Sequence, residues 1–293
     1  MAGQLKEVRN RIKSVQSTQQ ITKAMKMVSA AKLRRAQDAI IQMRPYAQKL
    51  QEMLSNIVSA SEAGAEMALA AERPAEKVLL IVISSDRGLA GAFNANVVKL
   101  TKSTIAEKFA DQAKNGNVTI WNIGKKAYEN LTKLNFKTDA TFKDIFLQLS
   151  FEKVQEAAAA ARQAFLNKEF DAVEIIYSQF KNAATQRFVA ERYLPIPRAE
   201  KKEGSTQADF IFDPEKNTLV AELMPRILNT QLYKAVLDSN ASEHGARMTA
   251  MDKASENANE MLRSLKISYN RARQAAITTE LTEIVSGAAA LQG

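Results

Sequence analysis

Glycine and proline are scarce at both ends of this chain, and that scarcity constrains its fold more than any other feature. Between Gly3 and Gly64 the only helix-breaking residue is Pro45. After Pro225 the only such residues are Gly245, Gly287 and Gly293. Both ends are therefore predicted to form long helices.

Each predicted terminal helix is too long to be stable without a partner. If residues 4–57 and 226–286 are mostly helical, each extends roughly 80 to 90 Å at 1.5 Å per residue. Apolar residues recur at a 3-4 spacing at the start of the chain (Leu5, Val8, Ile12, Val15). The same spacing recurs over about four heptads near the end of the chain, with one interruption at Ser255. The residues of this second stripe are Met248, Met251, Ala258, Leu262, Leu265, Tyr269, Ala272 and Ala276. We expect the two apolar stripes to pack against each other, as an antiparallel two-helix coiled coil.

The stripe of the N-terminal helix becomes polar after Val15. Continued at the same spacing, it falls on Gln19, Thr22, Lys26 and Ser29. The apolar residues move to a neighbouring face, at Ile21, Met25 and Val28. We interpret this change as a surface that contacts an external partner, because methionine adapts to more than one contact surface.

The middle of the chain alternates between strand and helix patterns. Apolar runs at 77–83 and 117–123 predict strands, and the segments at 171–180 and 187–196, joined by KNAATQ, predict a hairpin. Helical patterns cover 93–113, KKAYENLTKL and the alanine-rich stretch after Ser150. The fold class is thus α+β or α/β: terminal coiled coil plus a small central domain with a mainly parallel sheet. The predicted domains are 1–60, 74–213 and 214–293.

The net charge of +9 is concentrated at one end. Residues 1–50 contain eleven Lys or Arg and only two acids, so the remaining residues are neutral in sum. This pattern predicts a basic surface for an acidic partner. The start of the chain lacks an apolar signal-peptide core, and no apolar run approaches the roughly 20 residues of a membrane-spanning helix.

Few residues offer catalytic or ligand-binding chemistry. The chain has no cysteine and one histidine, His244, so thiolate metal sites and histidine clusters are excluded. The segment SSDRGLAG (84–91) follows a predicted strand, where phosphate-binding loops occur. Two glycines three residues apart also suit an ordinary tight turn, which we favour. For His244 we favour a helix-surface or interface position over a catalytic one.

Four segments closely resemble one protein family over essentially the whole length. They are IKSVQSTQQITKAMKMVSAAKLRRAQ, SSDRGLAGAFN, SEHGARMTAMDKASENANEML and YNRARQAAITTELTEIVSGAAAL. The family is that of the gamma subunit of the F-type ATP synthase. The resemblance implies a non-catalytic rotor shaft that couples proton-driven rotation of the c-ring to the catalytic cycle of the beta subunits. It implies no cofactor and no metal.

The resemblance also implies interface residues and partners. Lys23, Met25 and Lys26 match the segment beside an acidic lever of beta, and Arg273 and Gln274 match a pair that bonds a catch loop of beta. Thr278 and Glu280 match a tail segment important for coupling. Phe212 and Asp213 resemble, more loosely, the region facing the c-ring. The implied partners are the alpha, beta and epsilon subunits and the c-ring, on the cytoplasmic face of the bacterial inner membrane. Contact with the membrane would pass only through the c-ring.

Two other function classes are weighed against this interpretation. A basic coiled coil that binds nucleic acid accounts for the charge, but Tyr46 is the only aromatic residue in the basic stretch. A nucleotide-using enzyme centred on Asp86, Arg87 and Gly88 lacks a recognisable catalytic set.

Overall fold

The computed structural model describes residues 2–60, 69–183, 185–196 and 216–292. Two long helices form its ends: α1 (Ala2–Ala60) and α6 (Lys216–Gln292). The predicted terminal helices are confirmed, and both extend beyond the expected bounds of 4–57 and 226–286. Pro225 lies inside α6 and does not mark its start, and Pro45 lies inside α1 as expected. Phe212 and Asp213, the residues expected to face the c-ring, lie outside the described residues.

The chain divides into two compact units, described here separately. The terminal unit comprises Met1–Ser29 and Met248–Gly293, and the central unit comprises Ala30–Arg247. Both long helices contribute residues to both units. The sequence-based boundaries 1–60, 74–213 and 214–293 follow whole helices instead, and they stay a prediction.

The central unit contains a five-stranded sheet in the order β3-β2-β1-β4-β5. Its strands are β1 (Val78–Ile83), β2 (Val118–Ile123), β3 (Thr138–Asp139), β4 (Ala172–Phe180) and β5 (Gln186–Leu194). The first four run parallel, and β5 pairs antiparallel with β4 across the predicted hairpin. The prediction of a mainly parallel sheet with a hairpin at one edge is confirmed.

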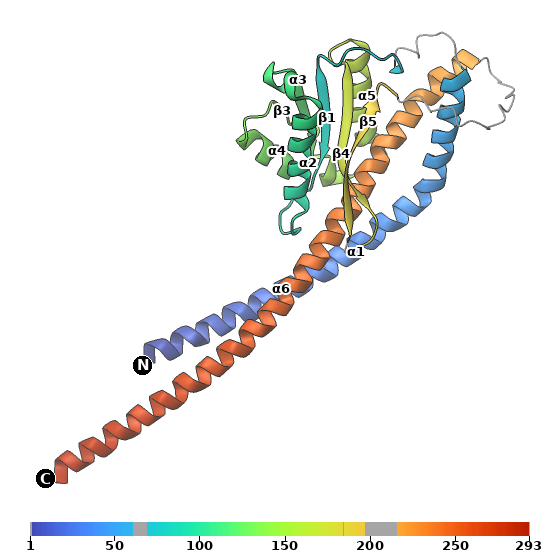
Figure 1. Cartoon of the computed structure of the whole chain (residues 1–293). Coiled ribbons are helices and arrows are strands. Elements are labelled where there is room, and N and C mark those ends of the chain that lie inside the picture. The colour runs from blue at the N-terminus through green and yellow to red at the C-terminus, as the bar shows by residue number, and fades with distance from the viewer. Residues whose placement is uncertain (1, 61–68, 184, 197–215, 293) are drawn as a thin grey trace. The chain divides into compact units, whose positions relative to one another are not determined.

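Helices cover both faces of this sheet, as Figure 1 shows. Alternate residues of β1 point into two separate cores because side chains along a strand face opposite sides. Leu79, Ile81 and Ile83 join the core with α5 (Phe151–Leu166) and with the part of α6 within the central unit. Val78, Leu80 and Val82 join the core with α2 (Phe93–Lys108) and α4 (Lys125–Lys133). Every β1 residue is buried, which explains the unbroken apolar run in the sequence.

Local signals fix the helix boundaries of the central unit. The Ser150 hydroxyl accepts a hydrogen bond from the backbone N–H of Lys153, so α5 begins where the sequence predicted. The expected helix at 93–113 is interrupted at Phe109, and α3 (Ala110–Lys114) follows. The short strand β3 and the 3-10 helix η2 (Ile145–Gln148) were not predicted, because neither is long enough for a pattern to repeat.

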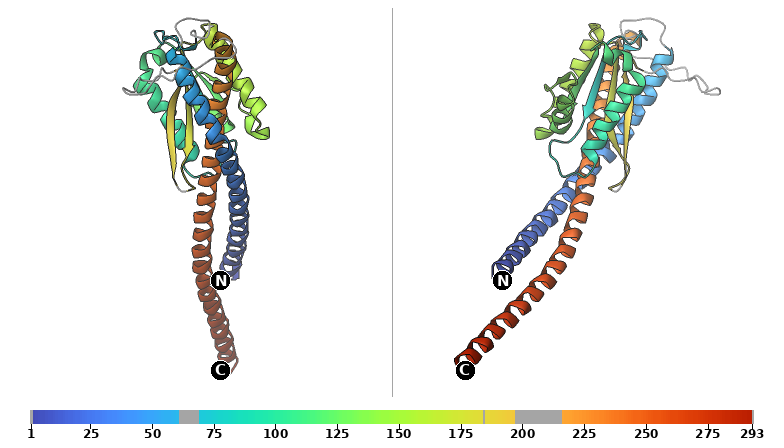
Figure 2. Two further views of the ribbon diagram at one scale, coloured as in Figure 1. Left: turned by 90° about the vertical axis from the view of Figure 1, so that its right-hand side faces the viewer. Right: turned by 60° about the vertical axis from the view of Figure 1, so that its left-hand side comes forward.

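In the terminal unit, α1 and α6 pair as antiparallel helices. Arg9 bonds Tyr269, Thr22 bonds Ser255, and Lys26 bonds Asp252. The partner's number falls as the first residue's number rises, which defines opposite chain directions. Figure 2 shows the C-terminal end of α6 extending past the N-terminus of α1. The predicted antiparallel coiled coil is confirmed.

Gly124, directly after β2, lies very close to the backbone of Ser84 after β1, so a larger residue there should destabilise the central unit. Its φ is +100°, and a Cβ there would lie 2.2 Å from the carbonyl oxygen of Ser84. We expect Gly124→Ala to lower the free energy of unfolding by about 2 kcal/mol or more, from strain and displacement of the Ser84 backbone. Urea denaturation measures this cost. Gly88→Ala is the matched control, because a Cβ at Gly88 meets nothing within 4 Å; equal costs for the two variants would contradict the prediction.

Candidate functional site

The segment SSDRGLAG occupies the position where doubly wound sheets bind ligands. It follows β1, and the sheet order reverses between β1 and β4. In open α/β sheets, ligands bind at the carboxyl ends of strands beside such a reversal. We call residues 84–91 the β1 loop.

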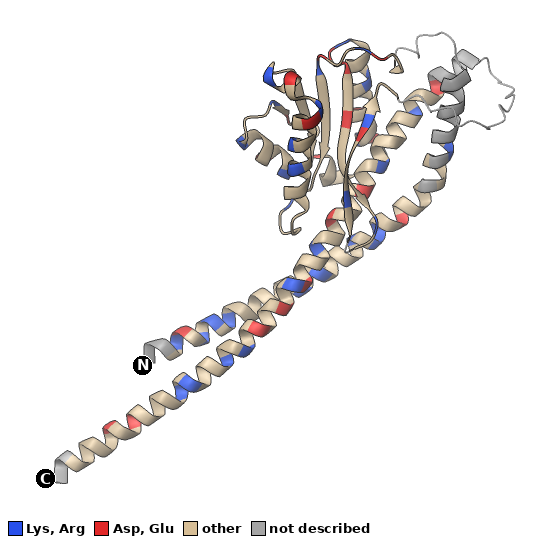
Figure 3. Cartoon of the chain, viewed as in Figure 1, with Lys and Arg blue, Asp and Glu red and all other residues tan. Residues whose placement is uncertain are grey.

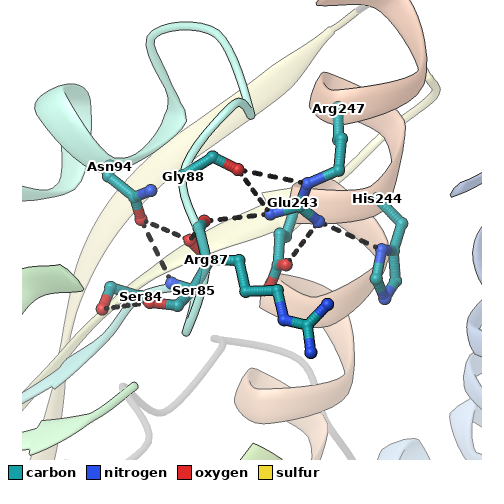
Figure 4. A network of polar contacts seen from close by, with 8 residues as sticks. All are labelled: Ser84, Ser85, Arg87, Gly88, Asn94, Glu243, His244 and Arg247. Carbon is teal, nitrogen blue, oxygen red and sulfur yellow. Dashed lines mark hydrogen bonds and ion pairs between the residues drawn. The ribbon is translucent and has the colours of Figure 1, made fainter. Parts of the chain in front are cut away.

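An arginine of α6 fills this position in the central unit. The buried Arg247 donates from Nη2 to the carbonyl oxygens of Arg87 at 3.0 Å and Gly88 at 3.2 Å. Its Nε donates to the Gly88 carbonyl at 3.3 Å. Its Nη1 donates to Oε1 of Glu243 at 2.6 Å and to Nδ1 of His244 at 3.4 Å. Figure 4 shows the guanidinium between the β1 loop and the side chains of α6.

The β1 loop also bonds the first amides of α4. In the first turn of α4, the N–H of Lys125 donates to Asp86, the N–H of Lys126 to the Ser85 carbonyl, and the N–H of Ala127 to the Ser84 hydroxyl. Helix N-termini bind anions through such amides when they are free. Here the first amides of α4 are already bonded, so they are not free to bind an anion.

Burial controls the charges around Arg247. Burial raises the pKa of Glu243, and the neighbouring guanidinium partly offsets that effect. Burial lowers the pKa of His244 to about 4, aided by the positive charges of Arg247 and Lys32. His244 is therefore neutral near pH 7, with its proton on Nε2 because Nδ1 accepts from Arg247. A neutral, half-buried histidine within a packed network fits the non-catalytic position that the sequence suggested.

The described part of the chain offers no alternative centre of chemistry. Among these residues, no three His, Cys, Asp or Glu side chains gather closely enough to hold a metal ion. None of the described helices has an apolar stretch long enough to cross a bilayer. The hypothesis of an enzyme centred on Asp86, Arg87 and Gly88 thus gains no support from the geometry.

The structure separates the three residues predicted near beta on α1. Lys23 is exposed, Met25 is half-buried, and Lys26 Nζ bonds Asp252 Oδ1 of α6 at 2.5 Å. Thr22 and Ser29 are buried. The polar positions after Val15 therefore continue the seam with α6, and the external contact inferred for the neighbouring apolar face stays a prediction. Neighbouring apolar side chains are nevertheless exposed: Ile21, Met27 and Val28.

The predicted residues of the C-terminal end lie on an exposed helix. Arg273, Gln274, Thr278 and Glu280 are all exposed, and the Thr278 hydroxyl donates to the Gln274 carbonyl at 3.0 Å. Glu280 lines a shallow groove together with residues of both terminal helices (Leu5, Lys6, Arg9, Ala276, Thr279, Glu283). In Figure 3 the last turns of α6 carry acidic residues and no basic ones.

Sequence reasoning missed three residues of α6 that bond other parts of the chain. Arg247, Asp252 and Ser255 were visible only as helix residues, although Ser255 was noted as an interruption of the apolar stripe. An unpaired polar residue inside an apolar stripe indicates a polar partner opposite. For Arg247 no signal was available, since its bonds go to backbone carbonyls of a loop about 160 residues away.

The two units define a class of protein in which an α/β domain is inserted between terminal helices that pair with each other. A family model described as ATP synthase matches residues 4–291. The chain is 53% identical to the ATP synthase gamma chain of Cytophaga hutchinsonii, over 98% of each chain. It is 50% identical to the ATP synthase gamma chain of Flavobacterium johnsoniae, over 99% of each chain. The chain therefore belongs to the ATP synthase gamma-chain family, as the resemblance predicted.

The fold agrees with this assignment. A chain in a solved structure of the Euglena gracilis mitochondrial ATP synthase, described as OSCP/F1/c-ring, superposes with a TM-score of 0.67. The two chains are 21% identical, and the match covers 99% of this chain and 95% of the other. A chain from the rotor of the same synthase has a TM-score of 0.63 at 22% identity, covering 94% of this chain and all of the other.

Removal of Arg247 tests whether the guanidinium holds the β1 loop in place. Arg247→Met leaves Glu243 buried without its counter-charge, so we expect the free energy of unfolding at pH 7.5 to fall by about 3 to 5 kcal/mol. Because the change raises the pKa of Glu243 further, the cost should shrink as pH falls and the carboxyl is protonated. Adding Glu243→Gln should restore part of the loss. Arg226→Met, at an exposed arginine of the same helix, is the control for urea denaturation. A loss no greater than the control's would contradict the account.

The lowered pKa of His244 predicts a pH dependence of stability. The unfolded chain binds this proton near pH 6.5 and the folded chain only near pH 4. Stability should therefore fall, by up to about 3 kcal/mol from this group, as pH decreases through that interval. His244→Gln keeps an acceptor for Arg247 and removes the titration. The difference between wild-type and variant unfolding free energies, measured from pH 7.5 to 4, should change accordingly; parallel curves would rule the account out.

Proposed function

We propose that this chain is the central rotor shaft of a bacterial F-type ATP synthase. In this role it is non-catalytic and couples proton-driven rotation of the c-ring to conformational cycling of the beta catalytic sites. Its family membership and the central-stalk fold support the assignment. The proposed location is peripheral, on the cytoplasmic face of the inner membrane, with contact to the membrane only through the c-ring.

The observation that carries this proposal is the unpartnered end of α6. Leu281, Ile284 and Val285 are 57%, 67% and 67% exposed, and with Ile277 they lie on one helical stripe. The polar pairs of the terminal unit have residue numbers that sum to 277 or 278, so α1 begins opposite residues near 277 of α6, and beyond the groove that Leu5, Lys6 and Arg9 share with Glu280 and Glu283 the stripe continues past it. A contiguous exposed apolar stripe marks a surface that another protein covers. A ring of alpha and beta subunits that encloses the end of α6 would cover such a stripe.

The central unit supports a non-catalytic role. Arg247 and the β1 loop fill the position where an α/β sheet would hold a nucleotide. The chemistry of ATP would then belong to other subunits. No cofactor is required for a chain that transmits force through packed helices.

The proposed contacts with beta divide into exposed and internally bonded groups. Lys23 is exposed, and it makes no ion pair with another described residue. Exposed ion pairs contribute only about 0 to 1 kcal/mol, which suits contacts that break and re-form during rotation. Met25 would supply an adaptable apolar contact. Lys26 would offer beta less charge than Lys23 because Asp252 already neutralises it.

The remaining partners are proposed from the family alone. Arg273 and Gln274 would bond a loop of beta, and Thr278 and Glu280 would contribute to coupling near it. Phe212 and Asp213 would face the c-ring. Epsilon would bind the central unit, and no nucleic acid is involved.

Reconstitution with the alpha and beta subunits of a bacterial relative tests the proposal. We expect one copy of the chain to join a ring of three alpha and three beta subunits, and steady ATPase activity to appear. Within this complex, Arg273→Glu and Glu280→Lys should reduce turnover more than assembly, because each removes one polar contact from a large apolar surface. Arg271→Glu, at an exposed neighbour, is the matched control. A chain that fails to join the ring, or variants that lose assembly at normal specific activity, would overturn it.

A further inference from the structure

Three polar pairs join the terminal helices over successive turns. Gln19 bonds Asn259, the hydroxyl oxygens of Thr22 and Ser255 lie 2.7 Å apart, and Lys26 bonds Asp252. The residue numbers of each pair sum to 277 or 278. All three pairs therefore belong to one antiparallel register.

The seam on the N-terminal side of these pairs specifies the register less strictly. Val8, Ile12 and Val15 of α1 are half-buried, as are Leu265 and Tyr269 of α6, and Leu262 is buried. Aliphatic side chains at a 3-4 spacing pack against one another in several registers, since burial is not directional. A shift of one turn would still place an apolar residue opposite most of these positions.

The polar pairs do not tolerate such a shift. Moving α6 by one turn would place Lys26 opposite Met248 or Ser255 and leave the Asp252 carboxylate without its cation. Thr22 and Ser255 are only 8% and 5% exposed, and a shift breaks the hydrogen bond between their hydroxyls. It would place longer polar side chains opposite these two buried positions, Asp252 and Gln19 in one direction or Asn259 and Lys26 in the other. In the observed register, one hydroxyl donates across the interface, and the other donates to a carbonyl of its own helix (Gln19 or Met251).

We propose that these six residues form a register lock, which fixes how α1 and α6 are aligned in the terminal unit. The lock deepens the proposed function: a shaft under torque transmits rotation only if its two helices do not slide along each other. A buried polar pair such as Thr22 and Ser255 is suited to this task because it specifies one alignment even where apolar residues would bind more strongly, and the more exposed pairs on either side of it share its register. Lys26 acts here as a positioning residue through Asp252.

Disulfide cross-linking of the full-length isolated chain measures the register directly, because the chain has no cysteine of its own. Ile12→Cys with Leu265→Cys reports the observed register, and Ile12→Cys with Leu262→Cys reports a shift of one turn. In the otherwise unchanged chain, we expect the first pair to oxidise at least about tenfold faster, because disulfides form only over short Cβ separations.

Charge reversal tests the lock. Lys26→Glu and Asp252→Lys, each alone, should bring the two cross-linking rates close together, and the double variant should restore the difference. Thr22→Val with Ser255→Ala should also bring the rates together without lowering the melting temperature, because it removes polarity and leaves packing. Unchanged rate ratios in the single variants, or no recovery in the double variant, would overturn the proposal.

The same variants in the complete membrane-bound synthase, with its c-ring, separate the lock from a direct contact of Lys26 with beta. Proton pumping per ATP hydrolysed should fall in Lys26→Glu and recover in the double variant if Lys26 acts through Asp252. Failure to recover would contradict the mechanical role of the lock and favour a direct contact. The cross-linking measurement uses the isolated chain and does not require the alpha and beta subunits. A chain that shows the register lock but does not join the alpha and beta ring would therefore contradict the proposed function and leave the lock intact.

Discussion

The central unit depends on one buried guanidinium. Arg247 binds two carbonyl oxygens of the β1 loop, and Glu243 supplies the charge that makes its burial possible. The β1 loop in turn bonds the first amides of α4, so α6, the sheet edge and α4 are held through one side chain. A buried pair of this kind contributes little net stability but is costly to break. The pair instead fixes one arrangement of the β1 loop against α6. A position that binds ligands in other open α/β sheets is therefore filled here by the protein's own side chains.

The terminal unit follows a different rule, because some of its surfaces must stay unattached. Polar pairs fix α1 against α6 internally, while Ile21, Met27 and Val28 on α1 and the last turns of α6 stay exposed. In a rotor these two tasks do not conflict, since contacts within the shaft persist and contacts with the ring change at each step. Weak, separate outer contacts prevent the shaft from being trapped at one angle.

Much of the fold was predictable because its signals are local and periodic. The scarcity of Gly and Pro predicted α1 and α6, the apolar run predicted β1, and Ser150 predicted the start of α5. The polar partners of Thr22 and Lys26 were not predicted, because they lie more than 220 residues away. The role of Arg247 was not predictable, since side chain bonds to backbone carbonyls leave no pattern in a sequence. The family was predictable because several long motifs coincide in one chain.

The central claim is that this chain turns inside a ring of catalytic subunits. Single-molecule observation tests it most directly: the alpha and beta ring is fixed to a surface, and a bead is attached through a cysteine introduced at the exposed Lys102 of the central unit. With ATP present, the account predicts rotation in one direction, with pauses every third of a turn. ATP hydrolysis by the same complexes with a stationary or randomly fluctuating bead would contradict it.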